Sequence, residues 1–367
     1  MNPIIKDKSW GNLRLYDWIN DMHGVQQSPV HHAEGDVATH TKMVLEELLK
    51  LPEYGSLTGE ARELLWVAAL MHDIEKRSTT RVEKNGDITS PGHAKKGAQT
   101  ANAILYRVFN IPLGWRMQMV GLVRHHGLPL WSMEKPDPGK AVIKASLEVN
   151  TQWLYILAKA DALGRICKDQ NELLERLEFF KELCIEQRCW GFPKVFDSNL
   201  AKFSYFRKET QSADFVPFDD TLSDVVILSG IAGSGKDHYL SLHHPKLPVV
   251  SLDKLRQAQK IDRNDTKGNG RIIQQAMEDA KKYLRSGEPF AWNATNITAQ
   301  MREQLINQFA VYKPRIKLVY LEVPYAKLLR QNKDREHSIP TIAVERMIDR
   351  LEVPKIWEAH EVAYCCQ

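Results

Sequence analysis

The glycine-rich string GIAGSGKD (230–237) directly follows the apolar run VVILSG (225–230). Its glycines allow backbone N–H groups to wrap around phosphates, and Lys236 is placed to reach the β- and γ-phosphates of a nucleotide. Because the string follows an apolar strand, it predicts a phosphate-binding loop (P-loop) that leads into a helix. The residues that this loop offers to a nucleotide are Gly230, Ile231, Ala232, Gly233, Ser234, Gly235, Lys236 and Asp237.

Short apolar runs alternate with helical runs throughout the last part of the chain. The predicted strands are 225–230, 247–253, 289–294 and 315–323, and the predicted helices are 269–286, 299–312, 325–335 and 341–351. Apolar strands that alternate with helices indicate a parallel sheet with helices on both faces. We therefore predict an α/β domain over residues 222–367.

The first part of the chain shows apolar residues at helical spacing instead. In TKMVLEELLKL (41–51), for example, apolar residues recur with the spacing of one helix face at Val44, Leu45, Leu48 and Leu49. Further helices are predicted at 61–73, 94–109, 114–125, 151–166 and 171–188, the first of them capped by Thr58. A chain of 367 residues fits two domains, so we predict an all-α domain over residues 1–210, followed by the α/β domain.

Composition restricts the function only weakly. Fifty basic residues against 46 acidic ones give a formal charge of +4, which is compatible with nucleic-acid binding but is no argument for it. The chain has no apolar stretch long enough to span a bilayer and no charged-then-apolar leader, so we expect a cytoplasmic protein without a membrane partner. The five cysteines lack zinc-ligand spacing, and a reducing compartment suits them.

Histidines are concentrated at the start of the chain, where eight of the 13 lie within the first 126 residues. His72 lies four residues after Ala68, so it continues the apolar stripe of its helix, and Asp161 has the same relation to Leu157. Burial of an ionised carboxylate is costly unless a cation or hydrogen-bond donors compensate. Inward Asp and His side chains from separate helices therefore predict a metal site.

The same residues carry a family resemblance. The order His40, then His72 and Asp73, then Asp161 is similar to the H…HD…D signature of the HD superfamily of metal-dependent phosphohydrolases. The resemblance covers roughly residues 25–190 and includes the strings HHAEGDVATHTKMVLEE, MHDIEK, PGHAKKGA, RHHG and KADALGR. One departure is Glu75, where family members often have Gly.

The resemblance implies two metal sites that share Asp73. The first would be held by His40, His72, Asp73 and Asp161. The second would be held by His93 and His126 with Asp73 as a bridge, and His125 competes with His126 for this role. His-rich ligation suits Mn²⁺, Ni²⁺, Co²⁺ or Zn²⁺, which would activate a water for attack on phosphorus.

Phosphate contacts are also implied by the resemblance. Asp73 and Lys76 would act in catalysis, and His32, Lys76 and Arg165 would contact the phosphate. Ordinary surface salt bridges remain the alternative for Lys76 and Arg165.

A second resemblance begins at Asp253, which ends the run LPVVSLD, with Arg256 one helical turn later. This resembles polynucleotide kinases, in which such an Asp accepts the proton of the attacking hydroxyl and the Arg binds the acceptor's phosphate. The end of a strand is where doubly wound sheets place their chemistry. The alternative is that Asp253 only caps a helix.

Three further features of this part show both likeness and departure. WNATNIT (292–298) is similar to the DATN element of these kinases, with Asn293 in the Asp position. LLRQNKDREHSIP (328–340) resembles their lid helix, with Arg335 expected to clasp the transferred phosphoryl group and Arg330 nearby. Asp237 replaces the usual Ser or Thr, and its carboxylate is also a hard oxygen ligand. We thus expect ATP or another NTP with Mg²⁺, in-line transfer supported by Lys236 and Arg335, and Asp253 acting on the nucleophile.

The order of the two parts resembles the bacterial HD-domain polynucleotide kinases, which are bifunctional RNA end-healing enzymes. This implies that the HD domain removes a 2′,3′-cyclic, 2′- or 3′-phosphate and that the P-loop domain phosphorylates a 5′-OH end. The implied substrate is a nucleic acid, preferably RNA, with functional coupling to an RNA ligase. Two alternatives stay open: an HD nucleotidase fused to a small-metabolite kinase, and an HD hydrolase gated by a degenerate P-loop domain that senses nucleotide.

Overall fold

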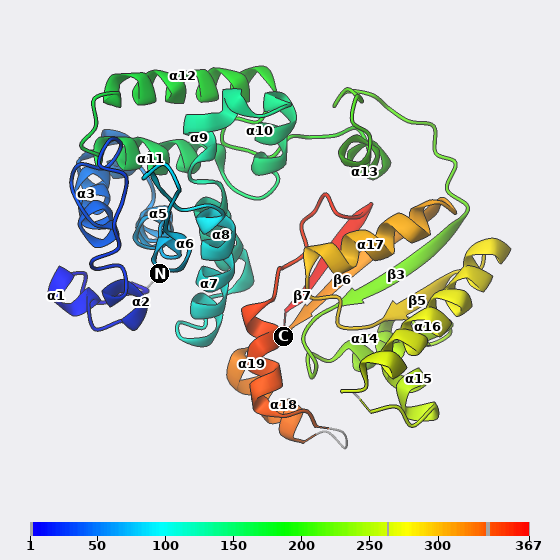
Figure 1. Cartoon of the computed structure of the whole chain (residues 1–367). Helices are drawn as coiled ribbons and strands as arrows, with labels where there is room; N and C mark the ends of the chain where they lie inside the picture. The colour runs from blue at the N-terminus through cyan, green and yellow to red at the C-terminus, as the bar shows by residue number, and fades with distance from the viewer. Residues whose placement is uncertain (1–2, 263, 335–337, 367) are drawn as a thin grey trace. The chain divides into compact units, whose positions relative to one another are not determined.

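The computed structural model describes residues 3–262, 264–334 and 338–366, and the chain divides into two compact units, Met1–Val195 and Phe196–Gln367 (Figure 1). The first unit is helical, and the second contains a parallel sheet with helices. This confirms the predicted fold class, an all-α domain followed by an α/β domain. The domain predicted for residues 1–210 overlaps the second unit at helix α13 (Asn199–Arg207), because Phe203 of that helix packs in the core of the second unit.

The first unit is built from short and medium helices around one apolar core. Its helices are α1 (Trp10–Leu13), α2 (Asp17–Asn20), α3 (Val37–Lys50), α4 (Pro52–Gly55), α5 (Gly59–Met71), α6 (Lys76–Thr79), α7 (His93–Arg107), α8 (Leu113–His125), α9 (Leu128–Trp131), α10 (Pro138–Ser146), α11 (Thr151–Leu163) and α12 (Gln170–Glu186). A 3₁₀ turn spans Ser132–Glu134, and β1 (Arg81–Val82) pairs with β2 (Ile88–Thr89). As predicted, Thr58 caps α5 by accepting a hydrogen bond from Ala61 N at 3.2 Å.

Four of these helices pack against one another and set the position of the site. Helices α3, α5, α8 and α11 bury apolar side chains such as Val44, Leu65, Leu122 and Leu157 in the common core. The ends of α5 and α8 and the start of α7 are histidines or lie next to histidines. The buried helix packing therefore fixes where those histidines lie.

The sheet of the second unit has the strand order β4-β5-β3-β6-β7, and every pair is parallel. The strands are β3 (Ser223–Ser229), β4 (Val249–Ser251), β5 (Phe290–Asn293), β6 (Pro314–Glu322) and β7 (Glu361–Cys366). β3 is the central strand and the first of these five strands in the chain, so the later strands are added on both sides of it. The place where the strand order changes direction is called the switch point. Ligands of doubly wound sheets bind there, beyond the carboxyl ends of the strands. The edge strand β7 is not among the strands predicted from the sequence.

The helices of the second unit include those that cover the two faces of this sheet. They are α13 (Asn199–Arg207), α14 (Lys236–His243), α15 (Leu252–Ala258), α16 (Thr266–Ser286), α17 (Ala299–Ala310), α18 (Tyr325–Lys333) and α19 (Thr341–Asp349). Val225 and Ile227 of β3 pack in one cluster with residues of α16 and α17, whereas Val226 and Leu228 pack in another with Leu240 of α14. Alternate side chains of one strand thus enter two cores, as expected for a strand that is buried on both faces.

Among the described residues, no helix is both long enough and apolar enough to cross a membrane.

Candidate metal centre and phosphate-binding loop

Five helices of the first unit bring six side chains to one buried place. His40 and Asp161 lie within α3 and α11, whereas His72 and His126 are the C-caps of α5 and α8. His93 is the first residue of α7, and Asp73 follows His72. The set is the one predicted as metal ligands: His40, His72, Asp73, His93, His126 and Asp161.

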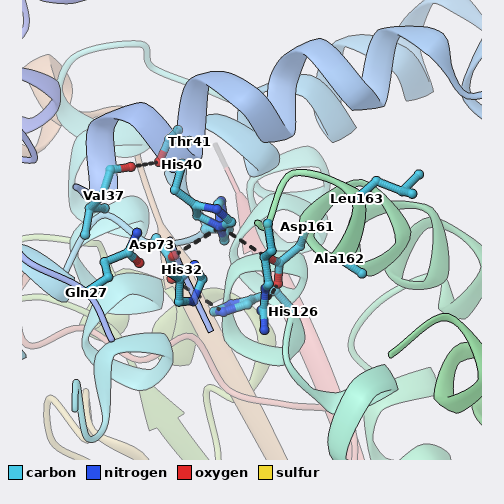
Figure 2. A network of polar contacts seen from close by, with 12 residues as sticks. Gln27, His32, Val37, His40, Thr41, Asp73, His126, Asp161, Ala162 and Leu163 are labelled. Carbon is cyan, nitrogen blue, oxygen red and sulfur yellow. Dashed lines mark hydrogen bonds and ion pairs between the residues drawn. The ribbon is translucent and has the colours of Figure 1, made fainter. Parts of the chain in front are cut away.

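The six side chains form two groups of potential ligand atoms. In the first group, His40 Nε2 lies 3.1 Å from Asp161 Oδ1, and their side chains point toward each other in Figure 2. In the second group, Asp73 Oδ1 lies 3.4 Å from His93 Nε2 and 3.7 Å from His126 Nε2. The other oxygen of Asp73, Oδ2, lies 3.2 Å from His72 Nε2. Asp73 thus faces both groups.

Three of the histidines are held in the same way. His72, His93 and His126 each have Nδ1 at 2.7, 2.7 and 2.9 Å, respectively, from the backbone carbonyl oxygen three residues earlier. A carbonyl oxygen can only accept, so Nδ1 carries the hydrogen and Nε2 presents a lone pair. Metal-ligating histidines are oriented by just such contacts. All three lone pairs are therefore directed toward the place where the carboxylates lie.

The electrostatics of the two carboxylates favour their ionised forms. Burial alone would raise the pKa of Asp73, but Lys76 and His72 outweigh it and hold this pKa well below its usual value. Burial acts likewise on Asp161, and Arg165 and His40 lower its pKa well below the usual value. Ionised carboxylates are ready to bind a cation without first releasing a proton.

The histidines respond to the same environment in two ways. Burial lowers the pKa of His126 to about 3, although Asp73 opposes this, so its ring is neutral near pH 7. Burial also disfavours charge on His72, but Asp73 and Asp161 outweigh it and raise its pKa. A metal ion at this place would compete with that proton. Among the described residues, His72 Nε2 and Asp73 Oδ1 are buried without a hydrogen-bond partner, as expected for atoms that await a cation.

Glu34 is a site residue that the sequence analysis did not identify. Its Oε1 lies 2.8 Å from Nδ1 of both His32 and His40, and its Oε2 accepts a hydrogen bond from Ile166 N at 2.9 Å. Burial would raise the pKa of Glu34, but its contacts with the two histidines lower it. A carboxylate on Nδ1 directs the Nε2 of His40 toward Asp161. The signal was present in the string HHAEGDVATH, but Glu34 precedes α3 and has no helical periodicity.

The three predicted phosphate-contacting residues lie beside these carboxylates. Lys76 Nζ lies 2.8 Å from Asp73 Oδ2, and Arg165 contacts both oxygens of Asp161, at 3.1 and 2.7 Å. His32 lies against His40, with ring centroids 4.7 Å apart, and burial lowers its pKa to about 4. Because the Lys76 and Arg165 side chains are only 10% and 12% exposed, ordinary surface salt bridges do not describe them.

The contacts of His125 and Glu75 place both residues outside the ligand cluster. His125 Nε2 lies 3.3 Å from Glu148 Oε2, so the structure brings His126 and not its neighbour into the cluster. Glu75 has φ −99°, which any residue adopts, so the local turn does not need glycine. Its buried carboxylate contacts Ser78, Thr100 and Lys96, and it adds no ligand to the two groups of potential metal ligands.

The second unit places the P-loop beyond the carboxyl end of β3. Gly230 has φ 152°, and a Cβ atom there would lie 2.5 Å from Leu321 O, so only glycine fits. Lys236 begins α14, and its Nζ donates to Gly230 O at 2.8 Å and Ile231 O at 2.9 Å. The loop therefore curls around its own lysine, whose ammonium group is held by the loop carbonyls.

Asp253 lies in the first turn of α15, just beyond β4. Ser251 caps this helix by accepting a hydrogen bond from Lys254 N at 3.3 Å, so the alternative of Asp253 as the cap is wrong. The exposed Asp253 carboxylate pairs with Arg256, which also donates from Nε to Asn269 Oδ1 at 2.8 Å. Since the strands are parallel, Asp253 and the P-loop lie at the same edge of the sheet.

The segment predicted as a lid, residues 328–340, lies only partly within the described residues. Arg335 lies outside the described residues, and Arg330 is exposed on α18. Asn332, which was not predicted, is buried; its side chain donates to Ile339 O at 2.8 Å and accepts from Ile339 N at 3.2 Å. These two hydrogen bonds tie Ile339 to the end of α18.

Comparison with protein families agrees with this geometry. An HD-domain model matches residues 37–165, and an AAA-domain model matches residues 225–354. The chain carries an HD domain followed by an AAA domain. The HD match contains all six predicted ligands together with the intervening helices, and the AAA match begins in β3 and includes the P-loop. Each match covers about a third of the chain.

Part of the chain is also similar to multifunctional CCA proteins. The protein of Thioalkalivibrio sulfidiphilus is 32% identical over 134 residues, which are 36% of this chain and 29% of the relative. That of Halorhodospira halophila is 34% identical over 113 residues, 31% of this chain and 24% of the relative. That of Methylococcus capsulatus is 33% identical over 122 residues, again 31% and 24%. The chain thus spans less than a third of the length of these relatives.

Two solved structures resemble 40% of the chain at 14% identity. A proposed kinase of Chloroflexus aurantiacus is covered to 89% with a TM-score of 0.34, and a sugar kinase of Janibacter is covered to 84% with a TM-score of 0.29. TM-scores this low do not establish a common fold. The fold of the second unit therefore rests on its strand order and on the AAA-domain match.

Proposed function

We propose that the protein is a bifunctional RNA end-healing enzyme. Its HD domain would remove a 2′,3′-cyclic, 2′- or 3′-phosphate, and its P-loop domain would transfer the γ-phosphate of ATP or another NTP to a 5′-OH end. The observation that carries the proposal is that one chain holds two separate sites suited to phosphoryl chemistry, the His/Asp cluster and the P-loop with Asp253. The products, a 3′-OH and a 5′-phosphate, are the ends that an RNA ligase joins, so we expect functional coupling to a ligase.

In the HD domain, the donor set fits divalent transition metals such as Mn²⁺, Ni²⁺, Co²⁺ or Zn²⁺. One ion would be held by His40, His72, Asp73 and Asp161, and a second by Asp73, His93 and His126. Bound metal lowers the pKa of water and polarises phosphate oxygens. Glu34 and the backbone carbonyls keep the ring nitrogens aimed at this place.

The cationic side chains beside this centre would bind the phosphate. Lys76 and Arg165 contact the carboxylates through some of their N–H groups, and the others remain able to donate to phosphate oxygens. His32 has its Nδ1 directed to Glu34, and a proton taken up at its Nε2 beside the phosphate charge would let it donate to a phosphate oxygen. Donors around a phosphate stabilise the negative charge that develops during hydrolysis.

In the kinase domain, Lys236 would leave the loop carbonyls and bind the β- and γ-phosphates, which the backbone N–H groups of residues 230–237 surround. Asp253 would accept the proton of the 5′-OH, and Arg256 would bind the phosphate of the acceptor. Arg335 would stabilise the transferred phosphoryl group, together with Mg²⁺. The exposure of Asp253 supports an acceptor that approaches from solvent.

One substrate tests both activities. The whole protein is incubated with γ-labelled ATP and an RNA oligonucleotide that carries a 5′-OH and a 2′,3′-cyclic phosphate. We expect label at the 5′ end and release of phosphate from the 3′ end. Label transferred only to small metabolites would instead indicate a metabolite kinase, and phosphate release that depends on ATP without transfer would indicate a nucleotide sensor.

Two substitutions test whether the sites are separate. Asp73→Ala should abolish phosphate release and leave 5′-phosphorylation, and Lys236→Ala should do the reverse. Circular dichroism checks that each variant is folded. Loss of both activities in either folded variant contradicts the two-site proposal.

A further inference from the structure

Two side chains that depart from the polynucleotide-kinase pattern contact each other at the P-loop. Asn293 Nδ2 donates a hydrogen bond to Asp237 Oδ1 at 2.7 Å. Asp237 lies in the first turn of α14, directly after Lys236, and Asn293 is the last residue of β5. Fifty-six positions separate them in the sequence, and the parallel pairing of β5 with β3 brings them together.

The chemistry of this pair is reversed with respect to other P-loop proteins. P-loop NTPases hold Mg²⁺ between the hydroxyl of a loop Ser or Thr and the carboxylate of an Asp at the end of a strand. Here the loop position carries the carboxylate, and the strand end carries a neutral amide. The pair therefore keeps a single carboxylate, but at the opposite position.

We propose that Asp237 and Asn293 form an exchanged magnesium site, in which Asp237 supplies the carboxylate ligand and Asn293 positions it. The inference rests on the proposed nucleotide binding by the P-loop. The hydrogen bond uses one of the two carboxylate oxygens of Asp237, which is exposed, and it uses the amide nitrogen of Asn293 rather than its oxygen. Asn293 is itself only 6% exposed, so its amide is held in place. Oxygen atoms of both kinds are ligands that Mg²⁺ accepts.

The position of Asp237 gives this site a particular property. A carboxylate in the first turn of a helix is favourable by itself, because the helix N-terminus is electropositive. Nucleotide phosphates bind to the same N-terminus, however, and the carboxylate repels them. A divalent cation between the two reverses the sign of the interaction. ATP binding should therefore depend on Mg²⁺ more strongly than it would with a hydroxyl at position 237 beside the neutral Asn293.

The hydrogen bond also explains why the strand position is neutral. An Asp at position 293 would bring a second carboxylate to within hydrogen-bond distance of Asp237, at a buried position. Like charges this close repel strongly where water is scarce. Asn293 avoids the repulsion and donates a hydrogen bond instead.

The test is a double-mutant cycle on nucleotide binding, without any acceptor. Calorimetry measures the Kd of the whole protein for a non-hydrolysable ATP analogue, with Mg²⁺ and with EDTA. The variants are Asp237→Ser, Asn293→Asp and the double variant Asp237→Ser/Asn293→Asp. Asp224→Asn removes a carboxylate at the amino end of β3, the end of this strand opposite to the P-loop, and serves as the control. Thermal unfolding checks that each variant is folded.

EDTA should raise the Kd of the wild type and of Asp224→Asn, and this rise should be about tenfold larger than the rise for Asp237→Ser. The reason is that Asp237→Ser lacks the carboxylate that repels the metal-free phosphates. Asn293→Asp should bind the metal-free analogue more weakly than the wild type. The double variant should regain most of the Mg²⁺ dependence that Asp237→Ser loses.

Other outcomes separate this inference from the proposed kinase. An unchanged dependence on Mg²⁺ in folded Asp237→Ser, or a double variant no better than Asp237→Ser, would overturn the exchanged site and leave the kinase in place. Failure of the wild type to bind the analogue under either condition would overturn both.

Discussion

The Nε2 atoms of His93 and His126 lie 3.2 Å apart, and the Nδ1 atom of each ring is directed to a backbone carbonyl oxygen. Two lone pairs at this distance repel each other unless a proton or a metal ion lies between them. Burial lowers the pKa of His126 to about 3, which disfavours a proton on that ring. The arrangement supports the proposal that both rings bind a metal ion.

The adjacent histidines allow a matched test of this interpretation. His126→Ala should reduce the number of transition-metal ions that remain bound per chain after dialysis, as measured by elemental analysis. His125→Ala removes the same ring from the next residue, whose partner is Glu148, and should retain the metal content of the wild type. Equal metal content in the two variants would show that His126 is not a ligand.

Glu34→Gln tests the carboxylate that lies between two histidines. Gln keeps the size of the side chain but removes the charge and one of the two acceptor oxygens, so the ring of His40 loses its orientation. Loss of such an outer contact typically costs about 10–100-fold in metal affinity or activity, and we expect a rise in the metal Kd of that order. Competition with a chromogenic chelator measures this Kd.

Glu75→Gln is the control for Glu34→Gln. Glu75 is also a buried carboxylate of the HD domain, but it contacts Ser78, Thr100 and Lys96. Its metal Kd should stay at the wild-type value. A similar change in both variants would mean that Glu34 acts through general stability rather than through His40.

Helical periodicity predicts two members of the cluster, His72 and Asp161, and the family resemblance implies the others. His72 and Asp161 continue apolar stripes, and burial on such a stripe identifies a polar residue that needs a partner. Glu34 is not predicted from the sequence because it precedes α3 in an irregular segment, where no helical periodicity relates it to the core. The direction of each ring nitrogen also depends on backbone carbonyls that only the folded helix ends bring into place.

In the α/β domain, too, the sequence predicts the regular buried elements but not the contacts that depend on the folded chain. The strands that bury both faces are predicted from their apolar runs, whereas β7 is an edge strand with partly exposed side chains and gives no such signal. The contact between Asp237 and Asn293 depends on β5 lying next to β3, and strand order is not encoded in local pattern. Ser251, rather than Asp253, caps α15 because the helix begins two residues earlier than the strand pattern suggests.

His360 should make the stability of the α/β domain depend on pH. Its Nδ1 accepts a hydrogen bond from Ile316 N at 3.0 Å, and its ring stacks on Phe203. Burial, with Arg207 and Arg315 nearby, lowers its pKa from 6.5 to about 4. The unfolded chain thus binds the proton more readily, so this stability is complete above pH 6.5 and is lost as the pH falls toward 4. The loss should reach at most about 3 kcal/mol.

His360→Asn isolates this effect, because Asn offers an acceptor to Ile316 N and does not titrate in this range. Urea unfolding of wild type and variant at pH 7 and pH 5 provides the comparison. The wild type should lose more stability than the variant between the two pH values, and contributions of other groups cancel in the difference. Parallel pH dependence of the two proteins would rule out His360 as the source.

Asp253→Asn tests the proposed general base of the kinase. Because Ser251 caps α15, the substitution should leave the stability of the helix nearly unchanged, while it removes the charge that accepts the proton of the 5′-OH. Turnover should fall by about 10²–10⁴-fold, the usual contribution of general-base assistance, and ATP affinity should remain near that of the wild type. Single-turnover 5′-phosphorylation and ATP binding measure the two quantities.

Ser251→Ala is the converse control, since loss of the cap should cost about 0.5–2 kcal/mol of stability and leave the turnover of the folded protein intact. Near-wild-type turnover in Asp253→Asn would require another base.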